Sequence, residues 1–246
     1  MVKPFFLLFI IFASSAWLYV LHYFGPNLHD SDGKDRVSFP SNLNELKTVA
    51  STLQTYSINH WWYVFIIFSS AYIYKQAFCI PGSLFLNILA GALYGNVGGL
   101  LFACTFTATG ASICYILSKT FARDLAISYF PQKIKDFEDK VNENGDRLFY
   151  FMLFLRLISV TPGWLINIAA PLVGIPLRVF YFSTLLGLGP YNFVGVSTGG
   201  MLSSLESVND VFSWKTLLNI SLIGLCALGP AFFIKSRNIK QNVKIP

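Results

Sequence analysis

The sequence predicts an all-α integral membrane protein in which two helices are interrupted within apolar stretches. The chain is 54% apolar and only 12% charged, about half the charged fraction of an ordinary soluble domain. The uncharged stretch from Leu84 to Ser118 exceeds the roughly 20 residues that one crossing of a bilayer needs. Pro81-Gly82 and Pro162-Gly163 each interrupt an apolar stretch. A simple bundle of transmembrane helices would not need two such interruptions.

Residues 1–24 are predicted to form an N-terminal transmembrane helix. Lys3 precedes a run without formal charge from Pro4 to Phe24, which is long enough to span a bilayer. Ser14-Ser15-Ala16 also resembles the small-residue end of a signal peptide. The apolar run continues well beyond those residues, so we favour an uncleaved helix, with a cleaved signal peptide as the alternative.

Residues 25–59 are predicted to form a polar loop followed by an amphipathic helix. The helix is indicated by apolar residues at helical spacing, namely Leu43, Leu46, Val49, Ala50 and Leu53. A second span is expected over residues 61–78, because Trp61-Trp62-Tyr63 suits the headgroup level of a membrane. Lys75, near the other end of this span, is expected to reach the interface through its long side chain.

Three later segments complete the predicted organisation. Residues 119–147 balance basic and acidic residues and are expected to form a surface helix. Residues 201–234 are expected to hold a loop and the last transmembrane helix. Residues 235–246 form a basic tail without acidic residues, and the excess of positive charge on cytoplasmic segments predicts that this tail is cytosolic.

An ordered set of residues occurs twice in the chain. Proline removes a backbone donor and breaks a helix, and the freed polar groups cannot face lipid. The segments near 79–94 and 148–175 are therefore predicted to be re-entrant half-helices, each followed by a full span, and paired interruptions of this kind indicate a transport site. The matching positions are Pro81-Gly82, Asn87, Gly95 and Gly110 in the first set, and Pro162-Gly163, Asn167, Gly174 and Gly189 in the second.

Few polar residues occur in these segments, and three of them are candidates for function. Asn87 and Asn167 occupy equivalent places in the two half-helices. Arg156 lies in an otherwise apolar stretch, where an arginine costs at least ~2.5 kcal/mol unless it reaches water, carbonyl groups or an anionic headgroup. No acidic residue lies in either Pro-Gly segment, so a lipid phosphate is an attractive partner for Arg156. The candidates for a lipid path are Arg156, Asn87, Asn167, Pro81, Gly82, Pro162, Gly163 and Ser83.

Catalytic, metal and cofactor sites are not predicted. The histidines are scattered, and the cysteines lack the paired spacing of zinc sites, so the cysteines are expected to be small buried side chains. No nucleophile, base and orienting group recur together, and no phosphate-binding GxxxxGK[ST] loop is present. The sequence therefore predicts neither an enzyme nor an ATP-driven transporter.

The motifs FCIPGS, NILAGALYG and GASICY in the first half, with FLRLISVTPGWLINIAAP in the second, resemble the DedA superfamily, also called the VTT-domain proteins. Within this superfamily, the sequence around Tyr72 and around Tyr191 is similar to that of the transmembrane protein 41 group. The resemblance covers roughly residues 40–235 and implies a VTT domain at 60–200 with two inverted repeats. It also implies residence in the endoplasmic reticulum and passive scrambling of phospholipids.

Two departures from the family pattern affect the functional expectation. Some bacterial members that resemble proton-coupled flippases carry acidic residues beside the first Pro motif. This sequence has Lys75-Gln76 there and lacks a carboxylate, which favours passive scrambling over proton coupling. Ser159 and Gly163 replace a proline and an asparagine expected at the second interruption. We expect membrane phospholipids as partners, no nucleic acid, and either membrane-protein partners or a homo-oligomer. The alternatives are an ion-coupled lipid or solute transporter and a membrane scaffold in trafficking.

Overall fold

The computed structural model describes residues 2–24, 43–122, 128–129, 131–143, 145–158 and 162–202. Every regular element in these ranges is helical, which confirms the predicted all-α class. The elements are α1 (Val2–Tyr23), α2 (Leu43–Ala77), α3 (Ser83–Leu117), η1 (Ser118–Ala122), α5 (Pro131–Glu143), η2 (Gly145–Arg147), α6 (Leu148–Ile158), α7 (Gly163–Ala169), α8 (Leu177–Gly187) and α9 (Gly189–Leu202). Apart from residues 201–202, the predicted last span and basic tail lie outside the described residues, as does the loop at 25–42.

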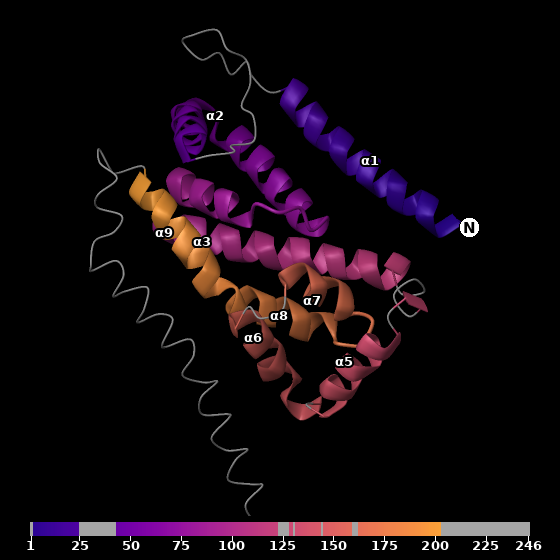
Figure 1. Ribbon diagram of the computed structural model, residues 1–246. Helices are drawn as coiled ribbons and strands as arrows, with labels where there is room; N and C mark the ends of the chain where they lie inside the picture. The colour runs from indigo at the N-terminus through magenta and orange to yellow at the C-terminus, as the bar shows by residue number, and fades with distance from the viewer. Residues whose placement is uncertain are drawn as a thin grey trace, which may run out of the picture.

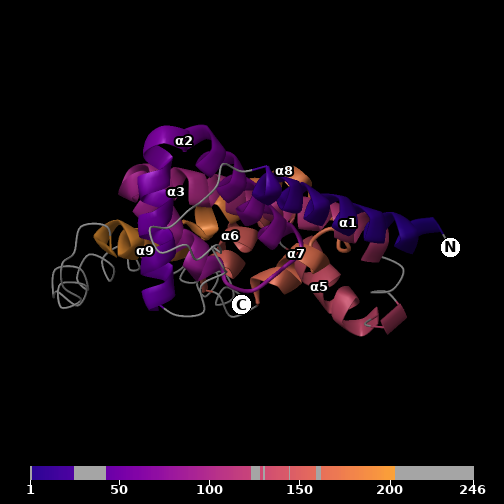
Figure 2. The ribbon, with the colours of Figure 1, turned by 90° about the horizontal axis from the view of Figure 1, so that it is seen from above.

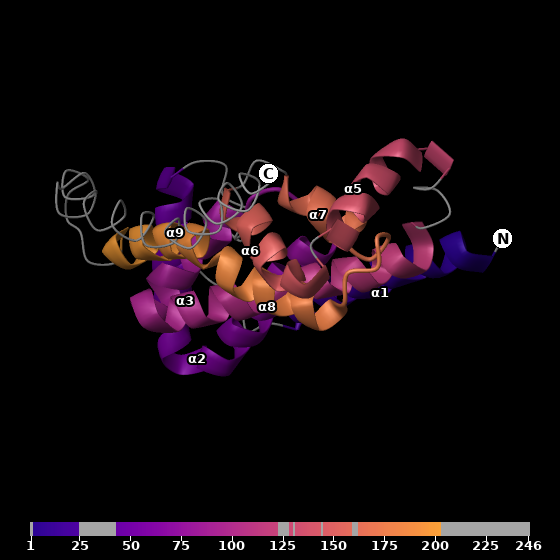
Figure 3. The same cartoon turned by 90° about the horizontal axis from the view of Figure 1, so that it is seen from below.

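Gly95 divides α3 into two parts, and the longer second part lies in the middle of the molecule. Helices α1 and α2 lie on one side of it and α5 to α8 on the other, while α9 crosses it (Figure 1). The N-terminal end of α1 extends past the other helices (Figure 2). Helices α6 and α8 lie side by side against α3 (Figure 3). The two interrupted segments therefore flank one central helix.

In the part of the chain that the structure describes, two helical stretches are long and apolar enough to cross a membrane, Phe5–Tyr23 and Ser83–Ala122. Helices α8 and α9 would make a third only together, because they are bent by 42° at Leu188. The expected single span after the second half-helix is thus a bent pair, and the reason is local: Pro190 has no N–H to continue the helical hydrogen bonds, and Gly187 and Gly189 flank the bend.

Helix α2 joins two segments that the sequence suggested were separate. The amphipathic segment and the predicted span at 61–78 form one helix with a kink at His60, whose φ and ψ are −134° and 43°. The span portion is not among the stretches that qualify by composition. Its polar side chains pair within the protein: Ser70 accepts a hydrogen bond from Trp17 at 3.3 Å, and Tyr74 bonds Ser15 at 2.8 Å. These contacts dock α1 along α2.

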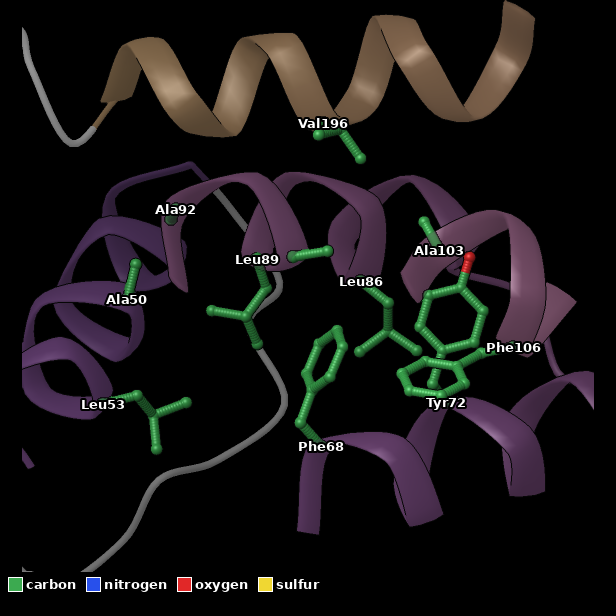
Figure 4. Close-up of a cluster of buried hydrophobic side chains, with 11 residues drawn as sticks. Ala50, Leu53, Phe68, Tyr72, Leu86, Leu89, Ala92, Ala103, Phe106 and Val196 are labelled. Atoms are coloured by element: carbon green, nitrogen blue, oxygen red, sulfur yellow. The ribbon is translucent and has the colours of Figure 1, made fainter. Parts of the chain in front are cut away.

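Both parts of α2 pack on the first part of α3. Ala50 and Leu53 lie before the kink, Phe68 and Tyr72 after it, and all four face the same buried cluster, with Val196 of α9 closing its far side (Figure 4). Gln54 Nε2 also donates to the Ala92 carbonyl oxygen at 2.6 Å. The amphipathic segment therefore clamps the short helical stretch that follows the first Pro-Gly pair.

Glycines bring α3 and α9 into backbone contact. A Cβ on Gly199 would overlap the carbonyl oxygen of Ile88, and one on Gly91 would overlap the carbonyl oxygen of Val196. A Cβ on Gly195 would lie 2.6 Å from Cβ of Asn87. Gly195 and Gly199 are four residues apart, the spacing that lets membrane helices approach closely.

The order of elements repeats on either side of the charged segment. Each Pro-Gly pair follows a helix and precedes a short helical stretch. A glycine with positive φ comes after each stretch: Gly95, with φ of 71°, interrupts α3, and Gly174, with φ of 76°, lies five residues beyond the end of α7. At Gly95 the ψ of 179° completes a conformation that is essentially restricted to glycine. These two glycines were matched by spacing in the sequence, and they share a backbone role in the structure.

Candidate functional site: two helix breaks around Cys79

The first break is a tight reversal between α2 and α3. The Ile80 N–H donates to the Lys75 carbonyl oxygen at 2.9 Å, and Gly82 has φ of 108°, which a residue with a Cβ rarely adopts. This reversal folds Ser83 back onto the last turn of α2, where Lys75 Nζ donates to Ser83 Oγ. Lys75 is consequently only 6% exposed. The expectation that it reaches outward to an interface is wrong.

Asn87 lies deeper, in a polar network that joins three helices. Its Oδ1 accepts from Tyr72 Oη at 2.6 Å, and its Nδ2 donates to Asn192 Oδ1 at 3.0 Å. Tyr72 Oη also lies 2.8 Å from Thr107 Oγ1, so the tyrosine accepts from the threonine while donating to the asparagine. Asn87 is fully buried. Its side chain ties the short stretch after the first break to α2, to the second part of α3 and to α9.

The second break is crossed by Arg156. Helix α6 ends at Ile158 and α7 begins at Gly163. From the last turn of α6, Arg156 Nη2 donates to Asn167 Oδ1 at 2.7 Å and Nη1 donates to the Gly163 carbonyl oxygen at 3.3 Å. The guanidinium also lies 5.1 Å from the ring centroid of Phe180. Arg156 is 3% exposed, and the protein partners that the sequence did not reveal are an amide and a carbonyl of the following helix.

The two breaks meet at Cys79. This residue has φ of 56°, and its electrostatic environment includes Lys75, Asn167 and Arg156. Its Sγ lies 3.3 Å from Cys114 Sγ on the second part of α3. We call the group Lys75, Cys79, Ser83, Arg156 and Asn167 the break site. One cationic side chain from each interrupted segment acts electrostatically on Cys79 there.

At both breaks, residues next to those of the break site are exposed. Pro81 and Ile80 are exposed at the first break, and Pro162 and Gly163 at the second. Trp164 is 52% exposed beside them. Exposed residues therefore adjoin the buried Lys75 and Arg156 along the chain at both breaks.

The predicted candidates divide into two groups in space. Arg156, Asn167 and Ser83 belong to the break site; of the four residues at the breaks, Pro81, Pro162 and Gly163 are exposed and Gly82 is half-buried. Asn87 instead bonds Tyr72 and Asn192. Lys75 and the Cys79–Cys114 pair were missed, because the contacts that define them cross the break and no spacing rule predicts them. Among the residues searched, no group of three or more metal-ligating side chains occurs.

Comparison with known proteins agrees with this architecture. A family model for the VTT domain matches residues 80–201, from the first break to the end of α9. A transmembrane protein 41 homolog from Caenorhabditis elegans is 33% identical over 83% of this chain and 83% of its own length. Transmembrane protein 41B is 32% identical in Danio rerio, over 93% of this chain and 81% of its own.

The human transmembrane protein 41B is 31% identical over 92% of this chain and 77% of its own length. No solved structure is detectably similar to the chain. The domain match and the relatives show the family: the chain belongs to the VTT-domain family of the DedA superfamily, among the homologues of transmembrane protein 41.

Proposed function

We propose that the protein is a passive, ATP-independent phospholipid scramblase. The observation that carries the proposal is the position of Arg156, a buried cation held across the second helix break by Asn167 and the Gly163 carbonyl. A charge at such depth in a membrane protein is costly and generally marks a pathway for polar or charged groups. The exposed Pro162 and Gly163 supply the approach from outside.

The path would run between the interrupted segments, which we infer to be re-entrant half-helices of two inverted repeats. A phosphate oxygen accepts charged hydrogen bonds more strongly than a neutral amide does. An arriving phosphodiester can therefore exchange with Asn167 on the guanidinium, and Asn167 can recapture Arg156 when the headgroup leaves. Acyl chains would stay in the lipid along the apolar rim. Such exchange consumes no energy source and carries lipids in both directions.

The location and partners belong to the same proposal. We place the protein in the endoplasmic reticulum membrane with a cytosolic C-terminal tail, acting on membrane phospholipids without a cofactor, alone or as a homo-oligomer. Relatives that the comparisons find are named as transmembrane proteins, and we infer no enzymatic activity.

The proposal is tested by substituting Arg156 in proteoliposomes that contain fluorescent phospholipid. A membrane-impermeant reductant bleaches outer-leaflet label, so scrambling appears as bleaching of label that began inside. Arg156→Gln is expected to slow scrambling at least about tenfold, because it removes a charged hydrogen bond of about 1.5–3 kcal/mol. The matched control is Arg178→Gln, since Arg178 is an exposed arginine on α8. Equal rates for the two variants would contradict the role of Arg156.

An imposed pH gradient separates this function from ion-coupled transport. Helices α3, α6, α7, α8 and α9 contain no acidic residue, so the interrupted segments offer no carboxylate to couple lipid movement to protons. We expect the same scrambling rate with and without the gradient. Net lipid movement that follows the gradient would favour the transporter instead. A scaffold would show no lipid movement in either condition.

A further inference from the structure

We propose that the break site binds one phosphodiester anion between Lys75 and Arg156, so that the two interrupted segments grip a single headgroup together. The proposal deepens the scramblase function and rests on it for the choice of a lipid phosphate. What it adds is a second cation, a defined place between the breaks and a test that does not depend on lipid movement.

Lys75 is the observation that calls for a ligand. Its ammonium group carries three N–H donors and is buried at the end of α2. In the described part of the chain, the groups that interact with it are the Ser83 hydroxyl and the Cys79 thiol. A buried cation is normally paired with an opposite charge or neutralised. The acidic side chains that the structure describes, Asp136, Glu138, Asp139 and Glu143, all lie on α5.

The position of the second cation, Arg156, also supports an anion site. Both breaks lie against the same turn of α3, because Cys79 Sγ is 3.3 Å from Cys114 Sγ and the Phe180 ring, over which the Arg156 guanidinium lies, has its centroid 5.1 Å from that of the Tyr115 ring. Lys75 and Arg156 both act electrostatically on Cys79. Like charges at short range repel more strongly where the effective dielectric constant is low. An anion between them would replace this repulsion with two attractions.

The remaining groups suit phosphate oxygens. Ser83 is the first residue of α3, whose N-cap Gly82 makes no side-chain hydrogen bond to the helix, and helix N-termini favour phosphate groups. The Ser83 hydroxyl can turn its proton from Lys75 toward an anion, since a hydroxyl rotates to suit its partners. Exposed Ile80, Pro81 and Trp164 border the site, and these apolar residues suit the glycerol and acyl parts of a lipid.

The test uses protection of Cys79 from a thiol reagent. In the full-length protein in maltoside micelles, Cys104, Cys114 and Cys226 are changed to Ala, so that Cys79 is the remaining cysteine. The rate of alkylation by N-ethylmaleimide is followed by mass spectrometry. Three probes are compared: short-chain phosphatidylcholine, diacylglycerol with the same chains, and inorganic phosphate. The first two differ only in the headgroup.

Phosphatidylcholine is expected to slow the alkylation of Cys79, and diacylglycerol is not. In Lys75→Gln the half-protecting concentration should rise about tenfold, because a charged hydrogen bond is lost. Lys75→Arg should retain protection. Lys119→Gln should match the parent, because Lys119 is an exposed lysine in η1. Native gel filtration of each variant verifies that it folds.

Protection by inorganic phosphate but not by phosphatidylcholine would keep the anion site and overturn its assignment to a lipid. Absence of protection by either anion, or equal protection in Lys75→Gln and the parent, would overturn the site itself. Scrambling is measured on the same variants in vesicles. Protection without scrambling would refute the proposed function alone, and scrambling by the parent without protection would refute the break site alone.

Discussion

At the scale of single residues, the buried polar side chains of the interrupted segments are paired with one another in two ways. Asn87 is held by neutral partners on α2 and α9, and a hydrogen-bonded buried network of this kind fixes its elements in place. Arg156 and Lys75 are held by groups just beyond the helix breaks, where an arriving anion can compete. We accordingly assign Asn87 a structural role, and we propose that the two cations handle the ligand.

Replacing Asn87 with Ala should destabilise the protein by about 1–3 kcal/mol, since it leaves the buried Tyr72 hydroxyl and Asn192 amide with fewer partners. The measurement is the thermal unfolding midpoint of the purified protein in detergent. Asn142→Ala is the matched control, because Asn142 is exposed on α5. If both variants unfold at the same temperature as the parent, the network does not contribute to stability.

Cys79 and Cys114 should form an intramolecular disulfide on treatment with diamide, since their sulfur atoms lie 3.3 Å apart. The two thiols lose their hydrogen atoms to the reagent, which is reduced to the hydrazine. Mass spectrometry of peptides detects the cross-link, which Cys79→Ser should abolish and Cys104→Ser should not. The bond would tie the first break to the second part of α3, so scrambling should slow and recover with dithiothreitol. If the only cross-link found contains Cys104, the described proximity of Cys79 and Cys114 is wrong.

At the scale of helices, close packing of α9 on α3 is what holds the first short stretch in place. Gly199 lies against the Ile88 carbonyl and Gly195 against Asn87, so the network around Asn87 exists only because these helices approach closely. The bend at Leu188 then carries the chain from α8, which packs on α6 and Arg156, to α9. One bent pair of helices therefore contacts both interrupted segments.

Gly199→Ala should reduce stability by about 1–3 kcal/mol, because the added methyl group would overlap backbone that cannot rotate away. Size-exclusion chromatography with increasing temperature would show earlier loss of the monodisperse peak. Gly189→Ala changes the same helix at a position where the new Cβ meets nothing within 4 Å, and it should behave as the parent. A Gly199→Ala protein as stable as Gly189→Ala would mean that the helices are farther apart than described.

At the scale of the whole molecule, the sequence predicted features that depend on neighbouring residues and did not predict those that depend on contacts between distant residues. Pro81-Gly82, Pro162-Gly163 and the glycines at 95 and 174 mark breaks through their own backbone chemistry, and the structure interrupts its helices there. The bend at Leu188 had a local signal in Pro190, but the uncharged run around it suggested one continuous span. Contacts between distant residues had no such signal: Asn87 and Asn192 are 105 positions apart, and Lys75 is buried only because the first break folds back.

The most direct measurement of the central claim is transbilayer exchange of fluorescent phospholipid by the purified, unmodified protein in vesicles without ATP or an ion gradient. Vesicles without protein should lose only the label of the outer leaflet to an impermeant reductant. Vesicles with protein should lose nearly all of it, within the time of the chemical reduction. If protein-containing vesicles keep their inner-leaflet label as protein-free vesicles do, the protein is not a passive scramblase.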